Sequence, residues 1–139
     1  MSTIFSKISK INKQRVDKIE SELFLLKSSI RQIEDKIRAV YDNIDGLEIP
    51  QNGDVSLLSL FQEQRKILNR QKSRLLKELS AKNLQLAQKY EEYKKAKLEF
   101  EKIKYLEEQE IAKKIEKLKK EEQKSLDEIS NMLYKGAVN

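Results

Sequence analysis

Three of the four residues that most often interrupt a helix lie within eight positions of one another. The 139-residue chain has three Gly and one Pro, and Gly46, Pro50 and Gly53 form a single cluster. Pro50 cannot continue a helix, and Gly46 can take the left-handed conformation that ends one. We therefore predict a single domain with one helix over about 3–45, a loop over about 46–54 and a second helix over about 55–135.

The first predicted helix carries an apolar stripe with the spacing of a coiled coil. Alternating steps of three and four separate its members, which are Val16, Ile19, Leu23, Leu26, Ile30, Ile33, Ile37, Val40 and Ile44. A 3.5-residue spacing held over four heptads predicts left-handed supercoiling against a partner helix. Ile4, Ile8 and Ile11 continue the stripe with a shift of about one position. The shift predicts frayed or re-angled packing near the N-terminus.

The second predicted helix has a looser stripe. Its apolar members are Leu58, Phe61, Leu68, Leu75, Leu79, Leu86, Tyr93, Ala96, Phe100 and Ile103. Charged residues fall on the same face, namely Arg65, Lys72, Lys82, Lys89 and Glu107. Long Lys and Arg stems can cover apolar surface while the charge stays in water. So many charges in one stripe are nevertheless expected to lower its stability.

The two predicted helices differ in length. At 1.5 Å per residue they span about 60 Å and about 120 Å, so a hairpin pairs the first helix only with residues up to about 100. The remainder keeps an apolar stripe at Ile111, Ile115, Leu118, Leu126, Ile129 and Leu133. An unpaired apolar face calls for a partner, either a second copy or a different protein. We therefore predict an all-α fold, a long antiparallel two-helix coiled-coil hairpin with an overhanging C-terminal helix.

The composition excludes most catalytic and metal chemistry. The chain has no Cys and no His, so it has no thiol nucleophile, no zinc finger and no imidazole metal site. The glutamates at 107–110 and 121–122 are flanked on both sides by lysines, which is typical of a solvated helix face. No apolar run is long enough to span a membrane, and no secretory signal begins the chain. We expect a cytoplasmic protein that is not an enzyme and needs no cofactor and no metal.

Residues 62–82 hold seven positive and two negative charges. A basic helix of this kind suits nucleic acid, an anionic membrane, an acidic protein surface or simple solubility. Salt dependence would separate these cases, since phosphate binding weakens steeply with salt. Tyr41 and Phe61 flank the loop on the two helices, where exposed aromatic side chains would suit a protein contact.

Two segments of the C-terminal third resemble the FliJ family. They are residues 98–104, Leu-Glu-Phe-Glu-Lys-Ile-Lys, and residues 119–129, Lys-Lys-Glu-Glu-Gln-Lys-Ser-Leu-Asp-Glu-Ile. The outline of the whole chain is similar too, with a shorter first helix, a loop near one third, a long second helix and a formal net charge of +6. YscO-like proteins of virulence secretion systems share this plan.

The resemblance implies a soluble component of the bacterial flagellar type III protein export apparatus, needed for flagellum biogenesis and motility. Members resemble the stalk of a rotary ATPase, bind a hexameric export ATPase and the cytoplasmic domain of the export gate, and handle export chaperones. It implies no nucleic-acid partner and a peripheral place at the cytoplasmic side of the inner membrane, reached only through partners.

The same resemblance assigns two sets of contact residues. The set expected to bind the ATPase is Ile4, Ile8, Ile11, Ile111, Ile115, Leu118, Leu126 and Ile129. The set expected to bind the gate, near the hairpin tip, is Val40, Tyr41, Ile44, Phe61, Arg65, Leu68 and Lys72. The alternatives are a coiled-coil chaperone or scaffold protein, and the YscO-like stalk of a virulence secretion system.

Overall fold

Two α-helices make up the fold. The computed structural model describes residues 4–138, with the side chain of Val138 excepted. Helix α1 covers Ile4–Asp45, helix α2 covers Val55–Val138, and no strand occurs between residues 4 and 138. The prediction of an all-α two-helix hairpin is confirmed. The expected helix start at residue 3 lies outside the described residues, and α2 continues past the expected end near 135.

A tightened last turn ends α1. The Gly46 N–H still donates to the Asp42 carbonyl at 2.9 Å, but the Leu47 N–H donates to the Ile44 carbonyl at 3.2 Å. This change from a four-residue to a three-residue step satisfies carbonyls that the helix end would leave free. The expected left-handed conformation of Gly46 is wrong: all three glycines lie in the described range, and none has a positive φ.

Helix α2 starts directly after Asp54. The Asp54 carbonyl accepts hydrogen bonds from the N–H groups of Leu57, at 3.1 Å, and Leu58, at 3.4 Å. Asp54 therefore occupies the N-cap position, where a carboxylate also interacts favourably with the positive end of the helix dipole.

The chain divides into two compact units. The hairpin unit is residues 17–95, and the terminal unit combines residues 1–16 with residues 96–139. Both helices pass through both units, so each unit contains a piece of α1 and a piece of α2.

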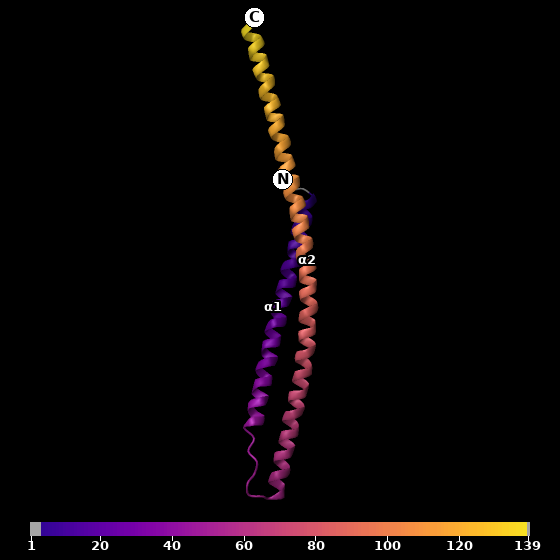
Figure 1. Cartoon of the computed structure of the whole chain (residues 1–139), viewed down its shortest axis with the longest axis vertical. Coiled ribbons are helices and arrows are strands. Elements are labelled where there is room, and N and C mark those ends of the chain that lie inside the picture. Colours follow the sequence, from indigo (N-terminus) through magenta and orange to yellow (C-terminus); the bar gives the residue numbers. More distant parts are fainter. Residues whose placement is uncertain (1–3, 139) are drawn as a thin grey trace. The chain divides into compact units, whose positions relative to one another are not determined.

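In the hairpin unit, α1 and α2 run antiparallel on either side of the 46–54 loop (Figure 1). The predicted stripe of α1 forms the core, because its members in this unit are buried or half-buried while most residues between them are exposed. The buried members are Ile19, Leu23, Ile30, Ile33, Ile37 and Val40. The heptad spacing therefore identified the packed face of α1.

The facing stripe of α2 is less deeply buried. Between residues 61 and 93 every predicted apolar member is half-buried, and so are the predicted charged members Lys72, Lys82 and Lys89. Two predicted members of the stripe, Leu58 and Arg65, are exposed instead. Leu58 is 44% exposed because α1 has ended at Asp45, and the chain opposite the first turns of α2 is loop.

In the terminal unit, the first residues of α1 pack along α2 near residue 96. Val16 and Ala96 are buried, Phe100 and Ile103 are half-buried, and the Arg15 guanidinium lies 3.9 Å from the Glu99 carboxylate. Beyond this contact, every residue of α2 from 115 to 137 is exposed. The C-terminal part of α2, yellow in Figure 1, thus lacks a helical partner in the terminal unit.

Candidate functional site

The residues predicted to bind an export gate lie in the hairpin unit, where α1 ends and α2 begins. Val40 is only 8% exposed and belongs to the core. Ile44, Phe61, Leu68 and Lys72 are half-buried along the same seam, whereas Tyr41 and Arg65 are exposed. Of the seven predicted residues, therefore, those most open to a partner are Tyr41 and Arg65, with the half-buried residues contributing their outer edges.

Tyr41 is held by a cation–π contact across the two helices. The Lys72 ammonium lies 5.4 Å from the centre of the Tyr41 ring. This distance is within the range in which the negative face of the ring attracts a cation. The contact joins two predicted residues from different helices and keeps an aromatic side chain at the surface, where a partner could bury it.

The structure exposes further apolar residues at this end, and of these the heptad pattern had singled out only Leu58. Five large apolar side chains between residues 49 and 60 are exposed: Ile49, Val55, Leu57, Leu58 and Leu60. The charges around them are acidic, because residues 42–54 contain four acidic and no basic residues. The sequence signal that could have predicted their exposure is the end of α1 at Asp45, because it leaves the first turns of α2 without a facing helix.

The residues predicted to bind an ATPase lie in the terminal unit. All are exposed except Ile8, which is half-buried. The apolar stripe on the unpartnered part of α2 begins at Ile111, which is 39% exposed, and the more distal members are more exposed. Ile4 and Ile11, on α1, are also exposed. This set therefore forms accessible apolar surface, as a docking role requires.

A change in the seam explains why these isoleucines face outward. Where α1 and α2 pack in the terminal unit, the half-buried positions of α1 include Ser9 and Asn12, and those of α2 include Glu107, Glu110 and Lys114. The heptad thus continues through polar residues. Ile4 and Ile11 on α1, and Ile111 and Ile115 on α2, each stand one residue away from a half-buried position and are therefore turned by about 100° from the seam.

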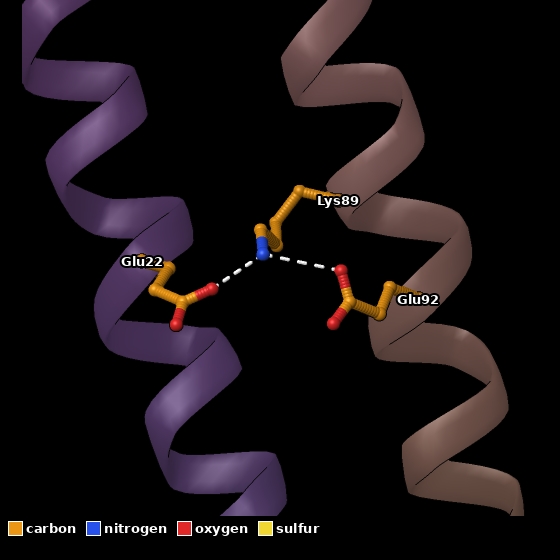
Figure 2. Close-up of polar contacts among 3 residues, drawn as sticks. All are labelled: Glu22, Lys89 and Glu92. Carbon is orange, nitrogen blue, oxygen red and sulfur yellow. Dashed lines mark ion pairs between the residues drawn. The ribbon is translucent and has the colours of Figure 1, made fainter.

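A three-residue ion-pair cluster crosses the seam of the hairpin unit. The Lys89 ammonium forms an ion pair with Glu22 on α1 and lies 3.1 Å from the Glu92 carboxylate on its own helix (Figure 2). Its side chain is less exposed than those of both partners. The heptad position of α2 at Lys89 is therefore charged, and its ion-pair partner, Glu22, lies on α1. Such a polar pair favours one pairing register of the two helices.

This cluster shifts the ionisation of two groups. The hydrogen bond from Lys89 is the main cause that lowers the pKa of the Glu22 carboxyl below 4.5. The hydrogen bonds to Glu22 and then Glu92 raise the pKa of Lys89 above 10.5. Both charged forms are thus stabilised, which describes a structural ion pair rather than a group poised for proton transfer.

Further cross-helix contacts flank the cluster in the hairpin unit. The Tyr93 hydroxyl donates to Glu20 at 3.1 Å, and the Lys27 ammonium lies 5.1 Å from the centre of the Tyr90 ring. Each contact joins α1 to α2. Together with Glu22 and Lys89 they fix how the two helices align in this part of the unit.

The described residues contain neither a metal-binding cluster nor a helix that could span a membrane. Between residues 4 and 138, no group of three or more acidic residues is placed to hold a metal ion. In that same stretch, neither helix has an apolar segment long enough to cross a membrane.

Comparison with known families matches the chain over its whole length. The family model described as flagellar FliJ protein matches residues 1–139. The chain belongs to the FliJ family. A search of curated proteins and a search of solved structures each find no match.

Family membership makes the chain a component of the flagellar protein export apparatus. The FliJ family is a family of export components and not of enzymes. The exposed surfaces at the tip of the hairpin unit and in the terminal unit are therefore candidate contact sites for other export components.

Proposed function

We propose that this FliJ-family chain is the stalk that links the hexameric export ATPase to the export gate and handles export chaperones. It would work at the cytoplasmic side of the inner membrane and be held there through its partners. The proposal assigns the terminal unit to the ATPase and the tip of the hairpin unit to the gate.

The observation that carries the ATPase assignment is the exposed apolar stripe on the unpartnered part of α2. Ile115, Leu118, Leu126 and Ile129 expose about half of their surface or more on a helix that has no partner of its own there. Burying such side chains is favourable by about 1.5–3 kcal/mol each when burial is complete. A ring of subunits that closes around the helix would supply that burial.

The ATPase assignment is tested with a variant that lacks residues 115–139. The truncation leaves the contacts between α1 and α2 in the terminal unit intact, because the removed residues with described side chains are all exposed. We expect the full chain to raise the hydrolysis rate of the cognate export ATPase and the truncated chain to leave it at its basal value. Leu98→Glu, which changes an exposed leucine outside the stripe, is the matched control and should retain the stimulation. Equal stimulation by the truncated and full chains would contradict the assignment.

The gate assignment rests on the exposed Tyr41, the half-buried Phe61 and the basic residues beside them. We expect Tyr41→Ala combined with Phe61→Ala to weaken binding to the gate's cytoplasmic domain about tenfold or more, measured by calorimetry, since buried aromatic side chains dominate such contacts. Phe24→Ala removes an exposed aromatic elsewhere on α1 and should bind normally. Unchanged affinity of the double variant would remove the tip from the proposal.

A further inference from the structure

The apolar stripe on the C-terminal part of α2 reads the same in both directions. Its positions are 111, 115, 118, 122, 126, 129 and 133, separated by steps of four, three, four, four, three and four. Six positions are apolar and exposed, and the middle one is Glu122. The helix is continuous through all of them. The stripe is therefore symmetric about Glu122.

The repeat of this stripe differs from that of the hairpin. It recurs every 11 residues, or 3.67 residues per turn, whereas the seam between α1 and α2 recurs every 3.5. At 3.67 residues per turn the stripe stays on one face of α2 for about 33 Å. Because Ile111 and Ile115 each follow a half-buried seam residue, Glu110 and Lys114, the stripe is turned about 100° from the seam. Helix α1 therefore does not cover it.

A symmetric stripe fits a second copy of itself in the antiparallel direction. When two copies are aligned at Glu122, Leu118 of one copy faces Leu126 of the other. The same alignment places Ile115 against Ile129 and Ile111 against Leu133. Every apolar member thus meets an apolar member, in the way that ridges and grooves of two helices interlock. On each copy, one groove is lined by Leu118, Leu126 and Ile129 together with Glu121, Glu122 and Ser125, and the small Ser125 leaves room for a facing leucine.

The net charges of the two halves of this segment favour the antiparallel direction. Residues 113–120 contain five lysines and one glutamate, whereas residues 121–128 contain four acidic residues and one lysine. Antiparallel pairing lays the basic half of each copy beside the acidic half of the other. Parallel pairing would lay like charges together, which is unfavourable. Charge and apolar spacing therefore indicate the same partner and the same direction.

We propose that this face of α2 binds a second copy of the chain, forming an antiparallel two-helix contact centred on Glu122. The contact depends on this chain alone and not on the ATPase. If the proposed function holds, the dimer covers the stripe that the ATPase would bind, so the two contacts exclude each other. The only unfavourable layer is the centre, where two Glu122 carboxylates meet.

Cysteine cross-linking of the full chain tests the contact and its direction, because the native sequence has no cysteine. We expect Glu122→Cys to form a covalent dimer on mild oxidation, since paired helices bring central positions within disulfide reach. Lys120→Cys, on the opposite side of α2, should stay monomeric. Leu118→Cys should cross-link when mixed with Leu126→Cys but not with itself. Self-cross-linking of Leu118→Cys would overturn the antiparallel direction.

Sedimentation equilibrium of the full chain measures the dimer without any partner. We expect a concentration-dependent dimer, a dissociation constant raised about tenfold or more by Leu118→Glu, and a lowered one for Glu122→Leu. Leu98→Glu should leave it unchanged, and circular dichroism should show equal helicity for all variants. A monomer throughout the micromolar range, or a dimer that Leu118→Glu leaves intact, would overturn the proposal. Neither outcome depends on ATPase stimulation, so failure here leaves the proposed function standing.

Discussion

At the residue scale, stability rests on a few side chains of α1 that face α2. Ile33 is 3% exposed, whereas Phe24, on the same helix, is 72% exposed. We expect Ile33→Ala to lower the free energy of unfolding by about 2–3 kcal/mol, since it leaves a cavity in a narrow seam. Phe24→Ala should change it by less than about 0.5 kcal/mol. Urea unfolding checks both values, and equal effects would contradict the assignment of the core.

The ion pair of Glu22 and Lys89 should make the stability of the fold depend on pH in both the acidic and the alkaline range. Because the pKa of Glu22 is lowered, its contribution is present above pH 4.5 and is lost as the pH falls through the folded-state pKa. Because the pKa of Lys89 is raised, its contribution is present below pH 10.5 and is lost as the pH rises through the folded-state pKa.

Thermal unfolding at several pH values tests this ion pair. We expect Glu22→Gln to lower the melting temperature near pH 7 and to match the native chain at pH values where Glu22 is protonated in both states. Glu91→Gln is the control, because the Glu91–Lys94 pair is exposed on both sides and should contribute little. A difference between Glu22→Gln and the native chain that persists in strong acid would contradict the ionic explanation.

At the element scale, the two helices contribute unequally to their shared seam. The regular heptads of α1 predicted its buried face from Val16 to Val40, because each position carries a β-branched residue or Leu. For α2, the spacing predicted which face packs against α1 but not how deeply its residues are buried. Its half-buried lysines follow the same spacing, and only the structure shows that Lys89 reaches Glu22 across the seam.

The polar part of the seam should open more readily than the apolar part. In the terminal unit, the half-buried positions include the polar residues Ser9 and Asn12 on α1 and Glu107 and Glu110 on α2, and the buried Glu110 Oε2 has no hydrogen-bond partner. We expect amide hydrogens of residues 5–12 to exchange faster than those of residues 19–40, which pack through apolar side chains. Exchange followed by mass spectrometry measures this, and equal protection of both segments would contradict the expectation.

At the scale of the whole molecule, the sequence predicted the fold class and the family but not the accessible surface. The helix-interrupting residues Gly46, Pro50 and Gly53, with heptad stripes on both sides of them, are enough to predict a two-helix hairpin. The candidate contact residues were less predictable, because accessibility depends on where one helix ends beside the other. Val40 is buried, whereas Val55 and Leu57, which no repeat singled out, are exposed because α1 ends at Asp45.

The uneven seam also has a consequence for synthesis. The apolar face of α1 is complete once Ile44 has been translated, but Ala96, which is buried beside it in the terminal unit, follows about 50 residues later. At about 5–20 residues per second, this delay lasts about 3–10 s on the ribosome. During that interval, neighbouring nascent chains on one messenger RNA expose identical zippers to one another. The seam lysines of α2, Lys72, Lys82 and Lys89, become available only one after another during this interval. Spacing between ribosomes or prompt capture by a chaperone would therefore set the yield of correctly folded chain.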